Sequence, residues 1–256
     1  TALVDFVFQQ EVIQKDYFTI DVDILHTTCF KEFIYALGTA AYDKIASRSD
    51  KMKRLFIATL RSLSASFGYD PIQNTPTFDI KLGDITTPDY TLREIFNFME
   101  QADKRCLVVI DEFQKITKYP EKNIEAVLRS YIQKMSNANF VFAGSQRTVL
   151  EEMFLSSRRP FFQSAKLMQL DAIELSVYQD FVVGHFREGG KDINPEAVEV
   201  AYRSFRGVTL YMQRVMKDAY ATTPQGATCD ERLVEQLIDD FVAENDYRIR
   251  GLLAYI

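Results

Sequence analysis

The sequence predicts an α/β protein in which helices cover a parallel sheet, followed by an all-helical domain. Strand and helix patterns alternate up to about residue 172, which is typical of a parallel sheet with helical crossovers. The run CLVVI, residues 106–110, is continuously apolar, as in strands that are buried on both faces. From residue 174 onward only helical periodicity appears. We therefore expect a core domain at 1–172 and a helical domain at 173–256.

The first hundred residues contain four segments with helical spacing, at 1–10, 29–46, about 51–67 and 91–102. Two segments alternate apolar and polar residues with a period of two, YFTIDVDI at 17–24 and PTFDIKLGD at 76–84. The first predicts a strand, and the second predicts an inserted strand or one arm of a hairpin. In the last of the helices we expect Thr91 to be the N-cap and Glu94 to occupy the capping-box position.

The rest of the core domain continues the alternation. After the strand at 106–110, short strand patterns follow at 139–145 and 166–173, with helical patterns between them at 121–135 and 147–155. The C-terminal domain is expected to contain helices at about 175–187, 195–205, 208–221 and 230–250. No internal repeat or low-complexity tract interrupts this order.

Composition narrows the classes of protein that fit. The 256 residues are 47% hydrophobic and carry a net charge of −6, which gives no reason to expect nucleic-acid binding through this chain. Cys29, Cys106 and Cys229 are odd in number and far apart. With two histidines, they argue against a disulfide framework and a histidine-rich metal centre. No apolar run approaches the ~20 residues of a membrane span, so we expect no membrane association and a reducing, cytoplasmic compartment.

Two carboxylates, Asp111 and Glu112, directly follow the most hydrophobic strand. Ligands of open parallel sheets bind outside the carboxyl ends of the strands. An acid at that place can hold Mg²⁺, directly or through water, in phosphoryl transfer. A second acid can orient and deprotonate an attacking water. The alternative is that Asp111 caps the next segment and Glu112 is a solvated side chain.

Polar residues after the next strands extend this hypothesis. Ser145 ends the strand at 139–145, where many ATPases have a polar residue that contacts the γ-phosphate or the attacking water. Arg158 and Arg159 precede the expected strand at 166–173. Either arginine can reach a phosphate of its own or a neighbouring subunit as an arginine finger. The alternatives are a serine in a turn and a pair of surface salt bridges, and the sequence does not choose between the two arginines.

The sequence resembles the archaeal ATPase group of AAA+/STAND-type P-loop NTPases, which is common in archaea and Bacteroidetes. The resemblance lies in CLVVIDEFQKITKYPEKNIEAVLRSYIQKMSNANFVFAGSQRTVLEEMF, in KDYFTIDVDI and FKEFIYALGTA, and in RSFRGVTLYMQRVM of the helical part. It implies a P-loop NTPase-type parallel sheet sandwiched by helices, a C-terminal helical lid, and ATP and Mg²⁺ as cofactors. The group usually adds a C-terminal winged helix and sometimes a nuclease-like domain.

The resemblance assigns roles by position. Asp111 and Glu112 correspond to the Walker B motif, and Ser145 to the sensor-1 residue. In the lid, Gly207 begins the sensor-2 turn, and Thr209 stands where many relatives have a proline, which makes a contact from this turn to the nucleotide base doubtful. Arg214 corresponds to a sensor-2 charge, although a position on the helix surface fits it equally well.

The phosphate-binding motif G-x-x-x-x-G-K-[ST] does not occur at any of the ten glycines; Gly190-Lys191, for example, is followed by Asp192. The opening residues TALVDFVFQQ resemble the helix that follows this motif in the group, and they show no signal peptide. On that resemblance Thr1 is the Mg²⁺-binding threonine, and the first strand, the glycine-rich loop and the lysine lie upstream. The C-terminal residues would end just before a winged helix.

These inferences lead to one expected function and two alternatives. The expected function is an ATP-dependent switch, in which hydrolysis of MgATP changes the angle of the helical lid. The first alternative is a non-catalytic interaction module on a degenerate NTPase fold, which binds a protein partner or a second copy through the lid. The second is a DNA-associated regulator, with nucleic acid bound only through a winged helix outside this chain.

Overall fold

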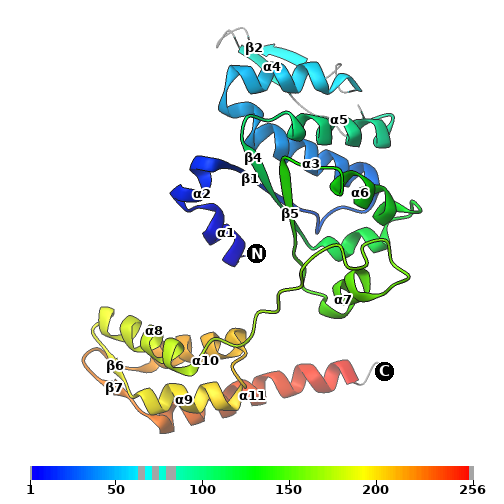
Figure 1. Cartoon of the computed structure of the whole chain (residues 1–256). Coiled ribbons are helices and arrows are strands. Elements are labelled where there is room, and N and C mark those ends of the chain that lie inside the picture. Colours follow the sequence, from blue (N-terminus) through cyan, green and yellow to red (C-terminus); the bar gives the residue numbers. More distant parts are fainter. Residues whose placement is uncertain (1, 63–66, 71–74, 79–84, 254–256) are drawn as a thin grey trace. The chain divides into compact units, whose positions relative to one another are not determined.

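The computed structural model of the chain describes residues 2–62, 67–70, 75–78 and 85–253. The chain divides into two compact units, Thr1–Lys166 and Leu167–Ile256. The first unit contains the sheet, and the second is built almost entirely of helices. Figure 1 shows the order of these elements along the chain.

The central sheet of the first unit has three parallel strands, in the order β1 (Tyr17–Asp23), β4 (Arg105–Asp111) and β5 (Ala138–Phe142). The pairing places Asp23 opposite Asp111 at the carboxyl ends of β1 and β4. β4 lies in the middle, and its neighbouring residues Val108 and Val109, which face opposite sides of the sheet, are both buried, as the continuous run at 106–110 predicts. The predicted mixed α/β architecture with a parallel sheet is confirmed at this level.

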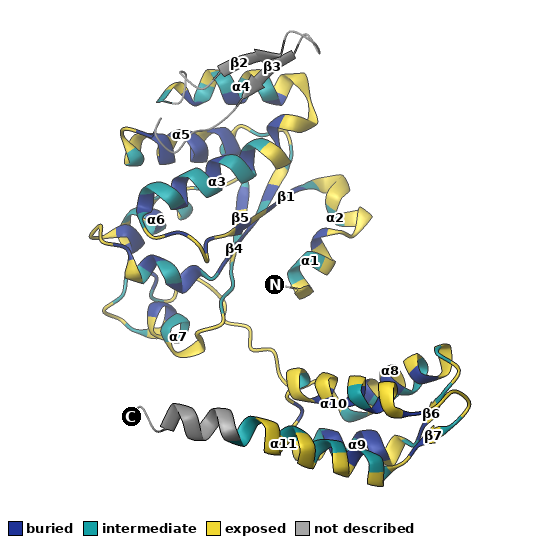
Figure 2. Ribbon diagram, turned by 180° about the vertical axis from the view of Figure 1, so that it is seen from behind, coloured by how far each residue is buried: buried dark blue, intermediate teal, exposed yellow. Residues whose placement is uncertain are grey.

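Helices cover one face of the sheet (Figure 2). These helices are α3 (Phe30–Lys44), α5 (Pro88–Glu100) and α6 (Ile124–Ile132). Alternate strand residues such as Ile20 and Val108 point into this layer and are fully buried. Each such side chain contributes about 1.5–3 kcal/mol through burial. The opposite face is covered less completely in the described part of the chain, because Asp21, Asn139 and Val141 are exposed there, whereas Val109 of the central strand is buried.

The remaining elements of the first unit surround this core. The helical elements are α1 (Ala2–Phe8), α2 (Glu11–Asp16), the short 3-10 turn Ala46–Arg48, α4 (Asp50–Thr59) and α7 (Arg147–Leu155). Two short strands, β2 (Phe67–Asp70) and β3 (Thr75–Phe78), pair as an antiparallel hairpin. The hairpin confirms the predicted arm in its first residues, whereas residues 79–84 lie outside the described part.

The predicted helix at 51–67 is too long, because α4 ends at Thr59. A buried carboxylate holds the chain after this end: Glu94 of α5 accepts hydrogen bonds from the backbone N–H groups of Arg61 and Ser62. Glu94 therefore does not act as the capping-box residue of its own helix. Nor is Thr91 the N-cap, since α5 begins at Pro88 with Thr87 before it. Proline suits the first helical turn because its missing N–H would have no intrahelical partner there.

The predicted strand at 166–173 does not form. Its residues have no ladder partner among the described strands, and Met168 and Leu170 are 76% and 73% exposed. The apolar-polar alternation of this segment is compatible with a strand, but an isolated strand leaves its backbone groups without partners. Pairing, which is a tertiary property, decides this case.

The second unit contains α8 (Leu175–Glu188), α9 (Pro195–Ser204), α10 (Thr209–Thr222) and α11 (Glu231–Leu253). A two-residue parallel ladder joins β6 (Asp192–Ile193) to β7 (Thr228–Cys229), a detail that the helix-only prediction missed. The four predicted helices are confirmed within a few residues at each end. No helix in the described part of the chain is long and apolar enough to span a bilayer.

Candidate functional site

The candidate site begins where β4 ends and the chain turns sharply. Glu112 adopts the left-handed conformation, with φ 56° and ψ 36°. Its backbone N–H donates to the Oδ1 atom of Asp111 at 3.0 Å. For a residue other than glycine this conformation costs roughly 1–2 kcal/mol. Asn123, Gln163 and Arg206 also have positive φ, so the conformation of Glu112 supports a functional role only together with the contacts that its side chain makes.

Backbone hydrogen bonds hold the chain after β5 beside this turn. The N–H of Ala143 donates to the carbonyl of Ile110 at 3.0 Å, and the N–H of Phe113 donates to the carbonyl of Ala143 at 2.9 Å. These bonds continue the β4–β5 pairing past the end of the strands. As a result, the hydroxyl of Ser145 donates to Oε2 of Glu112 at 3.1 Å. The structure therefore brings Ser145 to the adjacent acids Asp111 and Glu112, although 33 positions separate it from Glu112.

A second donor reaches the same carboxylate oxygen. The side-chain amide nitrogen of Gln114 donates to Oε2 of Glu112 at 2.5 Å. Gln114 is fully buried in the 3-10 segment Phe113–Lys118, labelled η4. Sequence reasoning missed Gln114, because a glutamine two residues after an acid pair has no distinctive signature by itself. The turn at Glu112 brings the carboxylate of Glu112 and the amide of Gln114 within hydrogen-bond distance of each other.

An aromatic cluster packs against this segment. Phe113 contacts the rings of Phe142, Phe154 and Phe161, with centroids 4.4, 6.2 and 5.4 Å away. The cluster ties η4 to β5, to α7 and to the segment after α7. Aromatic pairs of this kind contribute about 0.5–1.5 kcal/mol each beyond their area burial. The residue between Glu112 and Gln114 is therefore a rigid anchor for both.

Two further acids lie at the end of the neighbouring strand. Asp23 stands opposite Asp111 in the ladder and accepts the N–H of Leu25 at 2.8 Å. Asp21 lies two residues earlier on the same face of β1, and its pKa is raised by partial burial and then by the nearby carboxylates of Asp5 and Asp111. Sequence reasoning did not single them out. The period-two pattern of β1 contained the signal, because it places both acids on one face near the carboxyl edge.

The fit of this site to Mg²⁺ depends on oxygen donors. Asp111 supplies a carboxylate at the strand end, and Mg²⁺ commonly takes one or two protein carboxylates with water and phosphate oxygens completing the shell. The described residues contain no group of three or more His, Cys, Asp or Glu side chains that could hold a metal by themselves. Thr1, the other predicted ligand, lies outside the described residues. The fit is thus that of a shared metal–phosphate site rather than of a closed protein metal site.

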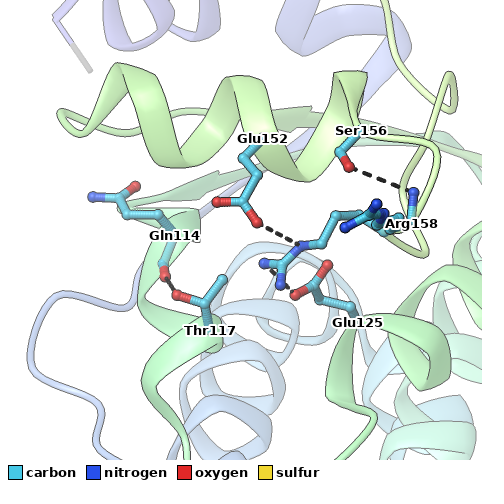
Figure 3. Close-up of polar contacts among 7 residues, drawn as sticks. Gln114, Thr117, Glu125, Glu152, Ser156 and Arg158 are labelled. Carbon is cyan, nitrogen blue, oxygen red and sulfur yellow. Dashed lines mark hydrogen bonds and ion pairs between the residues drawn. The ribbon is translucent and has the colours of Figure 1, made fainter.

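The two arginines have different environments, and Figure 3 shows Arg158, Glu125 and Glu152 among the residues around them. The guanidinium of Arg159 forms an ion pair with Oε1 of Glu125 on α6 at 2.7 Å and lies 3.9 Å from the carboxylate of Glu152 on α7. Burial raises the pKa of Glu125, Arg159 lowers it, and Glu152 raises it further. Arg158 is exposed, and its backbone N–H donates to the hydroxyl of Ser156 at 3.4 Å. No hydrogen bond or ion pair of the described residues joins either arginine to Glu112.

The remaining predicted residues belong to the second unit. Gly207 has φ +73° and lies in the turn after α9, with its N–H donating to the carbonyl of Tyr202 in the last turn of that helix at 3.0 Å. Arg214 forms an ion pair with Asp218 one turn further along α10, at 3.0 Å. Both observations describe these residues within their own unit. Gly207 has a clear local reason, because left-handed residues at helix ends are usually glycine.

Comparisons with known proteins give one informative result. No protein-family model and no curated protein matches the sequence. Among solved structures, a Walker-type ATPase of Pyrococcus abyssi is similar over 93% of this chain, with a TM-score of 0.57 and 13% identity. This chain covers 64% of the length of that structure. At this identity the likeness shows the fold alone, a mixed α/β structure with a small parallel sheet.

Proposed function

We propose that this chain is the nucleotide-binding part of an ATP-hydrolysing molecular switch, with Asp111, Glu112 and Ser145 in its hydrolytic site. The observation that carries the proposal is the carboxylate of Glu112, which a strained turn places at the carboxyl end of β4 and which Ser145 and Gln114 hold by one oxygen. The likeness to a Walker-type ATPase supports the same assignment at the level of the fold.

The proposed chemistry assigns separate tasks to the two acids. Oε2 of Glu112 is occupied by two donors, whereas no donor in the described part of the chain is within hydrogen-bond distance of Oε1. Oε1 is therefore the atom that would orient a water and accept its proton. Asp111, with Thr1, would hold Mg²⁺, whose charge when bound neutralises the phosphates. The hydroxyl of Ser145, which contacts Glu112, would also contact the γ-phosphate.

The proposal requires a phosphate-binding loop that none of the ten glycines of this sequence supplies. The edge of the sheet offers a place for it. β5 is an outer strand among the described strands, and Val141 on it is 41% exposed. The backbone groups on the outer edge of such a strand can pair with a further strand. We propose that this further strand, followed by the glycine-rich loop and its lysine, is supplied from upstream of Thr1.

The second unit would act as the lid of this site. Its helices form a separate core, which is what a rigid moving part requires. The turn at Gly207 and the charge of Arg214 are the elements through which we propose that the lid senses the nucleotide. We place the protein in the cytoplasm, in keeping with three unpaired cysteines.

The test is nucleotide hydrolysis by the full-length natural protein, after intact mass and terminal sequencing have established its N-terminus. We expect Mg²⁺-dependent release of phosphate from ATP, and GTP and CTP titrations would define the preferred base. A natural N-terminus without a Gly-Lys element, or a protein that binds no nucleotide with Mg²⁺ present, would refute the proposal.

A specific surface of the second unit favours a second candidate, the non-catalytic interaction module. An apolar groove of about 200 Å³ lies between α8 and α10, lined by Tyr178, Val182 and Met216 among others. Phe181 at its edge is 54% exposed. A second copy of the chain is the proposed occupant, because an isologous contact lets the same apolar patch cover itself. Sedimentation velocity of Phe181→Ser tests this self-association, and Val242→Ser, at an exposed position of α11, is the control. Concentration-dependent association that Phe181→Ser leaves intact would contradict a role of the groove.

A further inference from the structure

We propose that Gln114 is the positioning residue of Glu112, and that Gly144 provides the space in which the Gln114 amide sits. This inference rests on the proposed function, because it concerns how the hydrolytic carboxylate is held. It assigns roles to two residues that lie outside the acid pair and Ser145.

The burial of Gln114 is unusual for its contacts. The side chain is fully buried, yet only its amide nitrogen has a partner, the carboxylate of Glu112. Its carbonyl oxygen, Oε1, has no hydrogen-bond donor among the described residues. A buried polar atom without a partner costs about 1–3 kcal/mol. An apolar residue of the same size would avoid that cost, so the contact with Glu112 is what the glutamine contributes.

The orientation of the amide follows from charge. A carboxylate oxygen accepts hydrogen bonds, so the amide must present its nitrogen to Glu112 and its oxygen to the opposite side. That opposite side is Gly144. A Cβ atom at Gly144 would lie 1.9 Å from Oε1 and 3.0 Å from Cδ of Gln114, and 3.1 Å from Cδ1 of Leu150. A side chain at position 144 would therefore displace the amide.

Gly144 is not required by its backbone conformation. Among the described glycines, positive φ angles occur at Gly190, Gly207 and Gly226, and Gly144 is not one of them. An alanine can adopt the same backbone conformation without strain. The requirement at position 144 is thus for space, and the atom that occupies this space belongs to Gln114. This separates Gly144 from the glycines that only make turns.

The backbone under Gln114 is fixed, so its side chain has a defined direction. The hydroxyl of Thr117 donates to the carbonyl of Gln114 at 2.8 Å, a contact drawn in Figure 3. The N–H of Lys115 donates to the carbonyl of Glu112 at 2.9 Å. Together with the aromatic anchor at Phe113, these bonds hold both ends of the Glu112–Gln114 contact. The other donor, Ser145, is exposed and is held less firmly.

The experiment uses the full-length protein and steady-state ATP hydrolysis. Gln114→Leu removes the donor and keeps the volume. A displaced carboxylate lowers the rate of the chemical step, by up to about 100-fold for a 1 Å shift. We expect kcat to fall at least about tenfold, with KM for ATP changed less than about twofold. Because the orphaned oxygen is also removed, the unfolding midpoint should stay equal or rise, which a merely structural role would not produce.

Gly144→Ala tests the same contact without touching Glu112. It should lower kcat to a similar extent. The kcat of the double variant Gln114→Leu/Gly144→Ala should be no lower than that of the less active single variant, because both changes break the same contact. Gly184→Ala is the matched control, since a Cβ there meets no atom within 4 Å. Additive losses, an unchanged kcat, or a faster Gln114→Leu enzyme would each overturn the inference.

A second measurement separates this inference from the proposed function. If the wild-type protein hydrolyses no nucleotide, the proposed function fails. The contact itself is then read by NMR, from the side-chain amide resonances of Gln114. These resonances should shift in Glu112→Gln and in Gly144→Ala and stay in place in Gly184→Ala. Resonances that do not respond to Glu112→Gln would overturn the positioning role even in an active protein.

Discussion

The turn at Glu112 and the turn at Gly207 both reverse the chain through left-handed residues, yet they are built differently. At the end of α9, Arg206 and Gly207 have φ of 51° and 73°, and the glycine satisfies a helix-terminal carbonyl. At the end of β4 the left-handed residue is a glutamate, with φ 56°. Glycine would adopt that conformation at lower cost. The glutamate is therefore explained by its carboxylate and not by the turn.

The surroundings of the two turns support this contrast. Around Gly207, a Cβ would meet the methyl group of Ala172 at 2.6 Å and the ring of Tyr202 at 3.2 Å. Around Glu112, the neighbours are hydrogen-bond donors from two other segments, Gln114 and Ser145. Position 207 of the first turn excludes a side chain, although Arg206 beside it carries one, and the second turn orients a side chain. The comparison teaches that a strained residue with convergent polar partners deserves a functional test.

The largest expected effect comes from Glu112→Gln in the full-length protein. The amide keeps the shape of the carboxylate but cannot accept a proton, so ATP hydrolysis should fall by about 100-fold or more. Nucleotide affinity should change less than about twofold, since Glu112 is not proposed to bind phosphate or metal. Glu152→Gln, an exposed carboxylate on α7, is the control. Unchanged turnover in Glu112→Gln would show that the carboxylate of Glu112 is not needed for hydrolysis. The functional contrast with the turn at Gly207 would then be lost.

The next effect is on stability, from Gly207→Ala. An alanine there must adopt φ near +73° and must displace Ala172, which we expect to cost about 2 kcal/mol of the free energy of unfolding. Gly184→Ala, inside α8 with open space around it, should stabilise by up to about 1 kcal/mol. Urea unfolding of the whole chain, followed by circular dichroism, measures both. Similar results for the two variants would contradict the steric role of Gly207.

The two arginines permit a sharper separation of structure from function. Arg159→Met leaves the buried carboxylate of Glu125 without its ion pair, and we expect a loss of about 1–2 kcal/mol of stability. Arg158→Met changes an exposed side chain and should stay within about 0.5 kcal/mol. If Arg158 is the arginine finger, its variant loses hydrolysis while its unfolding curve is unchanged. The reverse pattern would assign the finger to Arg159.

The smallest expected effect concerns Asp21. Its folded-state pKa is raised above the ordinary 3.8 by burial and by Asp5 and Asp111, so the folded protein binds the proton more tightly than the unfolded chain does. Stability therefore falls as the pH rises from about 3.8 through the folded-state pKa, and the penalty persists above it. Asp21→Asn should raise stability at pH 7 by about 0.5 kcal/mol, the scale of exposed charge interactions, and flatten this acidic limb. Urea titrations across pH measure this. A stability that falls more steeply with rising pH in Asp21→Asn than in the wild-type protein would contradict the predicted direction.

Periodicity alone predicted the order of the elements well. The alternation at 17–24 and the apolar run at 106–110 each correspond to an observed strand. The acid pair was placed at the carboxyl end of β4, because the apolar residues end at Ile110. These predictions succeed because burial on a strand or helix face leaves a local pattern in the residue types.

The failures share a different cause. Glu94 fits a capping box by spacing, but the backbone it satisfies belongs to Arg61 and Ser62, far away in sequence. The segment 166–173 alternates as a strand does, yet no described strand pairs with it. In each case the local pattern is compatible with the predicted structure. Whether that structure forms depends on a hydrogen-bonding partner from a distant part of the chain, which the local pattern does not specify.

The sequence by itself determined the α/β class, the positions of most helices and strands, and the placement of two acids at a strand end. Those properties follow from local periodicity and from the cost of burying charge. Only the tertiary structure decided that Ser145 and Gln114 meet on one oxygen of Glu112, that Gly144 makes space for the Gln114 amide, and that Arg159 pairs with Glu125. Such contacts join residues from separate segments, and their geometry exists only after the β4–β5 pairing and the aromatic cluster have brought the segments together.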